Sequence, residues 1–313
     1  MSVTSPPLRV AYLGPPGTFS EEALVGQADL AAGELEPMRS FPEILAAVAS
    51  GDVDLGFVAL ENSLEGTVRL VLDGLIFEHD LLIQREVVLS VRQHLMGPAN
   101  TSLADVRRVV SFPEALGQCS RFFASRLPGV DLVAANSTAE AVRAVAVERE
   151  PGTVALGSVL AAKLYGLDVV ASDIDDHPEN ATRFVVVARD GVPAPTGHDK
   201  TSIVCFQRDD RPGSLHGILG QFTARNINLT KLESRPTKHT LGDYCFIVDL
   251  EGHVDDEVVA DCLRDLHAQL ANVKFLGSYP AAGEHGPAIR RDAEAAWREA
   301  DEWITSLRGQ VRR

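Results

Sequence analysis

Short apolar runs alternate with amphipathic segments along the first 190 residues of the chain. The runs are rich in Val, Leu, Ile and Ala and end at Gly, Pro, Ser or Asn, which predicts buried strands. Helix-start signals follow several of them. The predicted strands are 8–13, 55–60, 81–91, 109–111, 132–135, 154–156 and 184–188; one predicted helix opens at 18–23, and others span 41–48, 113–119, 139–148 and 159–165. This alternation predicts an α/β domain.

The segment from Asp190 to Lys200 is rich in Pro and Gly and interrupts this pattern, so we place a domain boundary there. Beyond it the order of predicted elements is β-α-β-β-α-β, which is the ferredoxin-like fold. Its strands are predicted at 201–207, 227–235, 243–250 and 273–279, and its helices at 213–225 and 255–270. This fold is a binding and assembly module far more often than a catalytic one.

The segment 284–313 carries Ala, Trp, Ile and Leu at helical spacing, with charged residues between them. This pattern predicts an amphipathic helix that docks on its own subunit or on a partner.

Composition narrows the class of protein. The 313 residues carry a net charge of −15, which disfavours nucleic acid and gives no reason to expect a membrane surface. No apolar run approaches the roughly 20 residues of a membrane span, and no secretory signal precedes the first strand. The four cysteines lack metal-site or disulfide-frame spacing. We therefore expect a cytoplasmic protein without metal or redox cofactor.

Polar residues stand where predicted strands end and helices begin. They are Thr18 and Ser20, Asn62 and Ser63, Ser111, Asn136 with Ser137 and Thr138, and Ser158. Each is either a helix N-cap or a ligand-binding group. In open α/β sheets the carboxyl ends of strands meet at the ligand crevice, and helix N-termini favour anions. We expect a pocket for an anion.

Thr182 and Arg183 lie at the start of the strand that begins at Phe184. A hydroxyl donor beside a guanidinium suits an anionic substrate that loses an oxygen. The alternative is an ordinary strand start with a surface Arg.

The motifs in this order resemble the prephenate dehydratases, from Val10 to about Tyr279. They are Gly14–Ser20 (GPPGTFS), Glu61–Gly66 (ENSLEG), Ser111 with Gln118-Cys119, Asn136–Thr138 (NST) and Asn180–Phe184 (NATRF). The C-terminal module resembles the ACT regulatory domain of that family, with PGSL at 212–215 and ESRP at 233–236. Ala59 replaces a usual proline, and Ser214 and His216 replace a usual Ala and Val.

This resemblance implies a catalytic domain at 8–190 with two lobes, similar to the fold of periplasmic binding proteins. Lobe 1 would take about 8–80 and 173–190, and lobe 2 about 81–172. An ACT domain would follow at 200–280, and the amphipathic helix at 284–313. The implied reaction converts prephenate into phenylpyruvate, water and CO2 without a metal or cofactor.

The resemblance also implies roles for individual residues. Thr182 and Arg183 would be catalytic, with Arg183 holding a carboxylate or orienting the loop of Thr182. Glu65 could be an acid, but a charged carboxylate is costly in a site for a dianion, so we expect a structural cap. The substrate-binding residues would be Thr18, Ser20, Asn62, Ser63, Ser111, Gln118, Asn136, Ser137, Thr138 and Phe184.

Feedback control is a further implication. L-phenylalanine would bind Gly213, Ser214, Leu215, Glu233, Ser234 and Arg235 across a dimer interface, and the chain would form a dimer or tetramer. Two alternatives stay open at this point: an arogenate dehydratase, and a non-enzymatic protein that senses an amino acid.

Overall fold

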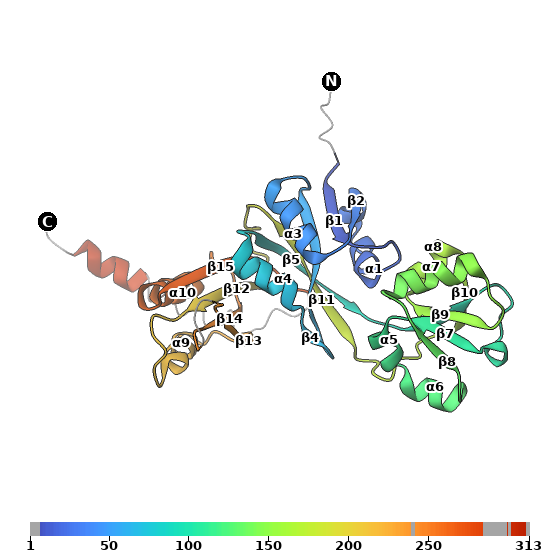
Figure 1. Cartoon of the computed structure of the whole chain (residues 1–313). Coiled ribbons are helices and arrows are strands. Elements are labelled where there is room, and N and C mark those ends of the chain that lie inside the picture. The colour runs from blue at the N-terminus through green and yellow to red at the C-terminus, as the bar shows by residue number, and fades with distance from the viewer. Residues whose placement is uncertain (1–6, 239–241, 284–298, 300–301, 311–313) are drawn as a thin grey trace, which may run out of the picture. The chain divides into compact units, whose positions relative to one another are not determined.

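The structure is a computed structural model that describes residues 7–238, 242–283, 299 and 302–310 (Figure 1). Its elements form two compact units. The first unit runs through His79 and resumes at Val87–Arg189. The second unit combines Asp80–Glu86 with the chain from Asp190 onward.

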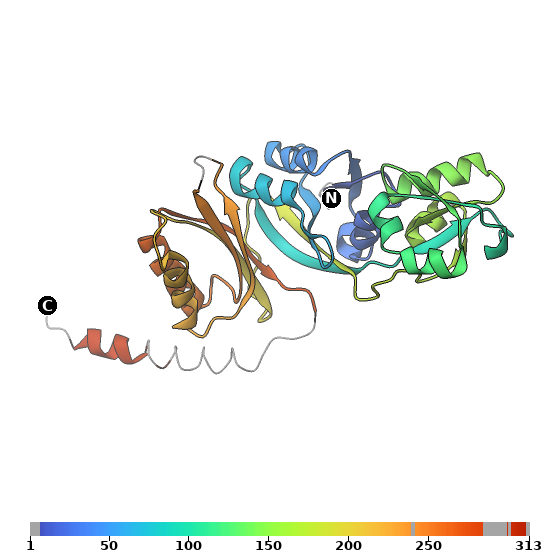
Figure 2. The ribbon, with the colours of Figure 1, turned by 60° about the horizontal axis from the view of Figure 1, so that its bottom comes forward.

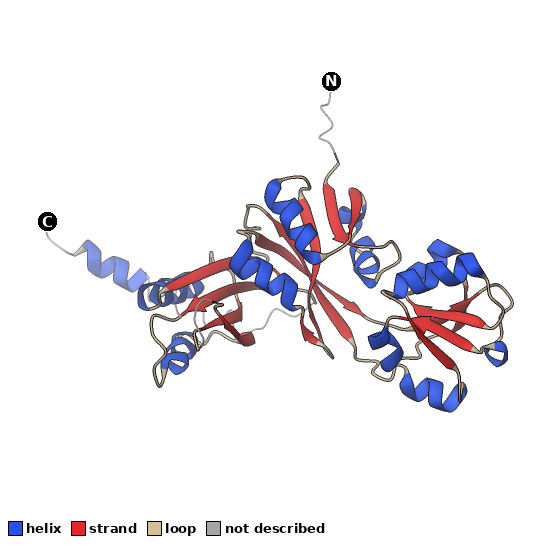
Figure 3. Ribbon diagram, viewed as in Figure 1, coloured by secondary structure: helices blue, strands red, loops and turns tan. Residues whose placement is uncertain are grey.

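The first unit contains two sheets (Figure 3). We call each sheet, together with its helices, a lobe. The first-lobe sheet has the order β2-β1-β3-β11-β5, with β4 added beside β3. Its β1 is parallel to β2 and β3, whereas β11 is antiparallel to β3. The strands are β1 (Arg9–Leu13), β2 (Glu34–Met38), β3 (Leu55–Asn62), β4 (Gly66–Thr67), β5 (Leu82–Ser90) and β11 (Ala181–Ala188).

Helices α1 (Phe19–Val25), α2 (Ala28–Ala31), α3 (Phe41–Ser50) and α4 (Arg69–Asp73) and the π-helix η1 (Gly74–Glu78) belong to this first lobe. Its core contains two aromatic rings from neighbouring strands, Phe57 of β3 and Phe184 of β11. The rings stack with centroids 5.0 Å apart.

The second-lobe sheet has the order β10-β6-β9-β7-β8. Its strands are β6 (His94–Gly97), β7 (Arg108–Ser111), β8 (Asp131–Ala134), β9 (Thr153–Gly157) and β10 (Asp168–Ala171). Its helices are η2 (Leu103–Asp105), α5 (Pro113–Gly117), α6 (Ser120–Arg126), α7 (Thr138–Glu148) and α8 (Val159–Tyr165).

The second unit has the predicted β-α-β-β-α-β order. Its antiparallel sheet runs β13-β14-β12-β15, and Figure 2 shows both helices on one face of it. The elements are β12 (Asp199–Phe206), α9 (Ser214–Thr223), β13 (Leu229–Pro236), β14 (Tyr244–Glu251), α10 (Glu257–Gln269) and β15 (Asn272–Pro280). The expected fold class, a two-lobed α/β domain followed by a ferredoxin-like module, is confirmed.

The first half of β5 packs within the second unit. Lys200 donates to both carboxylate oxygens of Glu86, at 2.8 and 3.1 Å, and the amide of Ala282 donates to Glu86 at 2.8 Å. Gly277 has a φ of +137°, and a Cβ there would come within 2.5 Å of the Ile83 carbonyl oxygen. Residues 80–86, which the sequence placed mainly in lobe 2, therefore pack with the second unit.

The connection back to the first lobe also differs from expectation. Ile174, expected in lobe 1, packs in the core of the second lobe. Most of the helix expected at 284–313 lies outside the described residues; within 302–310, positions 302–309 are helical and Trp303 is 61% exposed. Among the described residues, no helix is long and apolar enough to cross a membrane.

Candidate functional site

Thr182 and Arg183 face the end of β3 across the antiparallel pair β3–β11. Thr182 is opposite Asn62 and Arg183 is opposite Glu61, and the register shifts directly after Arg183. The apolar residues that follow, from Phe184, are buried in the core. The strand therefore anchors Thr182 and Arg183 at the edge where the first-lobe sheet ends.

The side chain of Asn62 joins the two strands. Its Nδ2 donates to Thr182 Oγ1 and to Asn180 Oδ1, both at 2.9 Å. Its Oδ1 accepts from the backbone amides of Leu64 (2.9 Å) and Glu65 (3.0 Å). Asn62 is thus held in one orientation by a turn of the Asx type.

This turn corrects one expectation. One of the two interpretations of Asn62 and Ser63 was a helix N-cap, but the chain turns into β4 and the next helix, α4, begins only at Arg69. Ser63 instead pairs with the loop before β11: its amide donates to the Ala181 carbonyl (2.9 Å), and its Oγ accepts from the Ala181 amide (3.0 Å).

Asn180 lies beneath this turn and is 1% exposed. Its Nδ2 donates to Gln118 Oε1 at 3.3 Å, and Gln118 Nε2 donates to Glu65 Oε1 at 3.4 Å. Gln118 follows α5 of the second lobe, whereas Glu65 and Asn180 belong to first-lobe segments. A row of side-chain amides thus runs between the lobes and ends at Thr182.

Arg183 is only partly accessible. Its side chain is 12% exposed, and its Nη1 lies 3.8 Å from Glu61 Oε2 on the neighbouring strand. This pairing holds the guanidinium along the sheet edge.

Five other residues predicted to bind the substrate lie at the starts of helices α1 and α7. Thr18 caps α1, and Ser137 caps α7 by accepting from the Glu140 amide at 3.0 Å. Ser20 is buried in α1, Thr138 is the first residue of α7, and Asn136 is exposed just before it.

Two other residues predicted to bind the substrate, Ser111 and Phe184, are buried in the structure. Ser111 is completely buried, and its Oγ donates to the Leu156 carbonyl at 2.8 Å. Phe184 is 2% exposed because its ring stacks in the first-lobe core. Neither side chain lines an accessible surface, because sheet pairing and core packing already use both.

The glycine turn before α1 is fastened to α8 of the second lobe. Ser158 Oγ donates to the Gly17 carbonyl at 3.0 Å and Tyr165 Oη donates to the Pro16 carbonyl at 2.8 Å. Gly17 has a φ of +95°, and a Cβ there would lie 3.1 Å from Ala161 Cβ. The turn therefore serves as a contact between lobes.

Burial shifts the acidity of several groups around this contact. It raises the pKa of Glu22 on α1, and the positive charge of Lys163 on α8 opposes that rise. Burial, followed by the nearby Glu21 carboxylate, also raises the pKa of Tyr12. In the second lobe, burial lowers the pKa of His94 and favours its neutral form.

Comparisons with known proteins agree with this architecture. The family model described as prephenate dehydratase matches residues 10–192, more than half of the chain, and the ACT domain model matches residues 201–268. The chain belongs to the prephenate dehydratase family.

Individual relatives cover nearly the whole chain. The prephenate dehydratase of Mycolicibacterium gilvum is 41% identical, over 96% of this chain and 98% of that protein. The structure of the Arthrobacter aurescens prephenate dehydratase in complex with L-Phe is 35% identical, with a TM-score of 0.86, over 96% of this chain and 99% of that one. A structure described as a novel type of quorum-quenching acylase is 30% identical, with a TM-score of 0.78, over 88% of this chain and 98% of that one.

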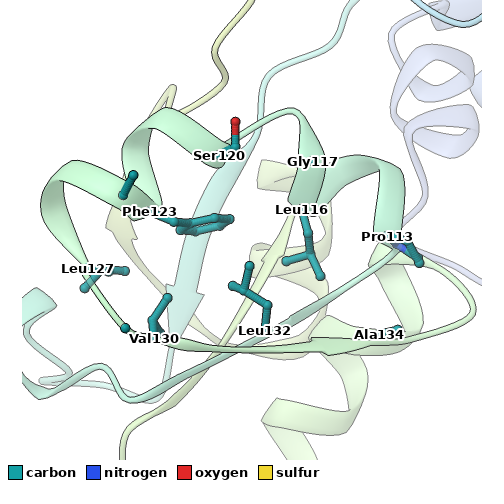
Figure 4. Close-up of a pocket in the computed structure, with 11 residues that line it drawn as sticks. Pro113, Leu116, Gly117, Ser120, Phe123, Leu127, Val130, Leu132 and Ala134 are labelled. Atoms are coloured by element: carbon teal, nitrogen blue, oxygen red, sulfur yellow. The ribbon is translucent and has the colours of Figure 1, made fainter.

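The second lobe has a cavity of about 540 Å³. None of the residues that line it belongs to the motifs shared with the family, although some are neighbours of Gln118 on α5 and α6. Figure 4 shows its lining, which is mostly apolar and includes Leu116, Phe123, Leu127, Val130 and Leu132. Such a lining offers little to balance the charge of a dianion.

The expected effector residues lie at two places in the second unit. Gly213, with a φ of +89°, precedes α9, and a cavity of about 390 Å³ is lined by Gly213, Ser214 and part of α10. Leu215 is partly buried and packs against the core of this unit. Glu233, Ser234 and Arg235 lie on β13, where Glu233 is 4.0 Å from Arg235 and 3.4 Å from Lys231.

The contacts of four residues were not predicted from the sequence. Asn180 was not selected as a site residue although it opens the NATRF motif, and Glu65 was read as a structural cap. Nothing in the sequence around Ser158 and Tyr165 indicated that their side chains bind the glycine turn.

Proposed function

We propose that this chain is an enzyme, a carbon–oxygen lyase that converts prephenate into phenylpyruvate, water and CO2. The observation that carries the proposal is the hydrogen bond from Asn62 Nδ2 to Thr182 Oγ1 at the sheet edge. Membership of the prephenate dehydratase family supplies the substrate class.

The reaction moves electrons within the substrate. The bond between the ring and its carboxylate breaks and CO2 leaves. The electron pair enters the ring and expels the ring hydroxyl, which takes up a proton and departs as water. Because the product ring is aromatic, the reaction requires no redox cofactor. The enzyme must bind a dianion and assist the departing oxygen.

Thr182 is suited to that assistance. Its oxygen accepts from Asn62, so its own O–H proton is available to donate to the leaving hydroxyl. A positioned donor of this kind contributes about 10²–10⁴-fold to rate.

Other residues would bind and orient the substrate. The start of α7, with Asn136, Ser137 and Thr138, offers free backbone N–H groups for a carboxylate. Arg183, held beside Glu61, would fix the strand that carries Thr182, or turn its fork toward the second carboxylate. Ser63 and Gln118 border the same edge.

The test uses the purified full-length chain and measures formation of phenylpyruvate. Thr182→Val should lower kcat by about 10²–10⁴-fold with little change in KM, because only the departing oxygen loses its donor. Thr182→Ser, which keeps the hydroxyl, serves as the matched control and should retain most of the activity. A folded Thr182→Val variant with wild-type kcat would refute the role of Thr182.

Two other activities need assays of their own, because neither forms phenylpyruvate. Turnover of arogenate in place of prephenate would identify the closest alternative substrate, which differs by an amino group on the side chain. An acyl transfer would need a base that takes the proton of the attacking hydroxyl. The side-chain partner of Thr182 Oγ1 in the structure is the Asn62 amide, which is a donor and not a base, so the geometry does not favour this activity.

We further propose a homo-oligomer, a dimer or a tetramer, in the cytoplasm, with feedback inhibition by L-phenylalanine at the second unit. The L-Phe complex of the Arthrobacter relative and the match to the ACT domain support the effector. Gly213 at the start of α9 suits close approach of a backbone to the effector's carboxylate.

A further inference from the structure

Strand β5 (Leu82–Ser90) belongs to both compact units of the chain, because the boundary between them falls within it, after Glu86. Beyond this boundary β5 is a strand of the first-lobe sheet and lies beside β11, which carries Thr182. Val87 is buried in the first-lobe core cluster that also contains Phe184. One continuous strand is therefore part of both units.

The first half of β5 is anchored in the second unit by Glu86. This side chain is 2% exposed, and both of its carboxylate oxygens accept hydrogen bonds: Oε1 from Lys200 at 2.8 Å, and Oε2 from Lys200 at 3.1 Å and from the Ala282 amide at 2.8 Å. A buried carboxylate is costly without such partners. The backbone of Ile83 also lies so close to Gly277 that a Cβ there would come within 2.5 Å of the Ile83 carbonyl oxygen. Movement of β12 or β15 would therefore move β5 as well.

The other end of β5 reaches the loop that precedes Thr182. Val91 directly follows the strand, and its amide donates to the Asn180 carbonyl at 2.8 Å. Asn180 also accepts at Oδ1 from Asn62 Nδ2, the same group that donates to Thr182 Oγ1. The chain from Glu86 to Val91 spans about 17 Å when it is extended. A shift of β5 would therefore act on the backbone beside Thr182 without any contact between effector and substrate.

We propose that β5 carries feedback inhibition from the second unit to Thr182, and that Glu86 is the residue that fastens the strand to the second unit. The inference rests on the proposed inhibition by L-phenylalanine and on the proposed role of Thr182. L-phenylalanine bound to the second unit favours one position of β12 and β15, and substrate bound at Thr182 favours another position of β5. Two ligands that favour different positions of one element weaken each other's binding.

Residues 190–198 also join the two units and are the alternative route for this coupling. They contain neither helix nor strand, and most of them are exposed. Asp199 holds the end of this segment, since its carboxylate accepts from the amides of Thr196 and Gly197 and from Thr196 Oγ1. An exposed segment without regular structure absorbs a movement by local bending. Strand β5, paired in a sheet, is the stiffer connection.

Two matched variants separate these routes. Glu86→Gln places an NH2 group where an oxygen accepts and so loosens β5 from the second unit. Asp199→Asn makes the same change in a buried carboxylate that holds the 190–198 segment. The measurement is kcat/KM for prephenate in the purified full-length chain without and with saturating L-phenylalanine, and the ratio of the two values is the inhibition factor.

We expect Glu86→Gln to lower the inhibition factor by at least about 2-fold, the smallest change typical of a residue that carries coupling. Asp199→Asn should leave the factor unchanged. Without effector, kcat of Glu86→Gln should stay near that of wild type, because the bond from Val91 to Asn180 joins backbone groups. Calorimetry should show L-phenylalanine binding to Glu86→Gln about as tightly as to wild type.

Hydrogen exchange gives a second readout that needs no turnover. Saturating L-phenylalanine should change the exchange rate of the Val91 amide in wild type, and much less in Glu86→Gln. Unchanged exchange at Val91 in wild type would overturn the role of β5 even if Glu86→Gln does not fold.

The kinetic outcomes are equally distinct. A wild-type inhibition factor in folded Glu86→Gln, or a loss confined to Asp199→Asn, would overturn the role of β5. A wild-type enzyme that turns over prephenate without any response to L-phenylalanine would overturn the proposed feedback and this inference together. A protein without prephenate turnover would overturn the proposed function, while exchange at Val91 would still test β5.

Discussion

At the scale of single residues, Glu22 carries a carboxyl group into the contact between the lobes. Burial raises its pKa above the ordinary 4.5, although Lys163 opposes the rise. A carboxyl whose pKa is higher in the folded state holds its proton more tightly there. Its contribution to stability is therefore present at low pH and is lost as pH rises through the folded pKa.

Replacing this carboxyl should reveal that dependence. Glu22→Gln removes the buried charge, so we expect a higher free energy of unfolding than wild type at pH 8. The difference should shrink toward zero as pH approaches the ordinary value of a glutamate. Urea unfolding at pH 5 and pH 8 measures it, with exposed Glu148→Gln as control. A wild-type advantage at pH 8 would mean that attraction to Lys163 outweighs burial.

The sequence predicted Thr182 and Arg183 from the residues around them, but it could not predict their connections. Asn62 and Asn180 are 118 residues apart, and Gln118 is 62 residues from Asn180. Local patterns carry no information on such partners. Ser111 and Phe184 were predicted to bind the substrate for the same reason. Only the folded structure shows that Ser111 bonds to the Leu156 carbonyl and that Phe184 stacks in the core.

At the scale of elements, the glycine turn before α1 is adapted to the contact with α8. Gly17 combines a left-handed backbone with a close approach to Ala161. Either feature alone disfavours a side chain, and here both occur at one position.

Gly17→Ala should destabilise the chain more than an ordinary left-handed glycine does. Gly129 provides the comparison, because its φ is +78° and an added Cβ would have open space. We expect Gly129→Ala to lower the free energy of unfolding by about 1 kcal/mol from backbone strain alone, and Gly17→Ala to lower it by about 2–4 kcal/mol through strain and overpacking. Urea titrations of both variants measure this difference. Equal losses would show that the turn yields without disturbing α8.

Elements with strong apolar runs were predicted well, and weak ones were missed. The ferredoxin-like module was predicted in order, and its strands β12 and β14 have clear apolar runs. Strand β2 reads Glu-Leu-Glu-Pro-Met and was not predicted, because it lies at the edge of the first-lobe sheet beside β1. Edge strands tolerate proline, which argues against a central strand when it is read from sequence alone.

At the scale of the whole molecule, the second unit is where feedback by L-phenylalanine is expected to originate. Gly213 precedes α9 with a left-handed backbone, and an added Cβ there would meet no neighbour. A larger side chain at this position therefore changes what can approach the backbone while the unit keeps its core.

Gly213→Val should abolish inhibition by L-phenylalanine while turnover without the effector stays near that of wild type. Gly197→Val is the matched control, since Gly197 also has a positive φ and open space. Calorimetry on the intact protein should show L-phenylalanine binding to wild type and to Gly197→Val, and weakened binding to Gly213→Val. Absence of binding to wild type would exclude this effector.

The pairing of Glu86 with Lys200 determines whether the second unit can be removed from the chain without loss of stability. The boundary between the two units crosses β5, so it does not fall at a single place in the chain. A chain cut after Arg189 would keep the buried Glu86 carboxylate but lose the Lys200 ammonium and the Ala282 amide that satisfy it. Loss or exchange of the module during evolution would therefore require compensating changes inside the catalytic sequence, and the two units would be inherited together.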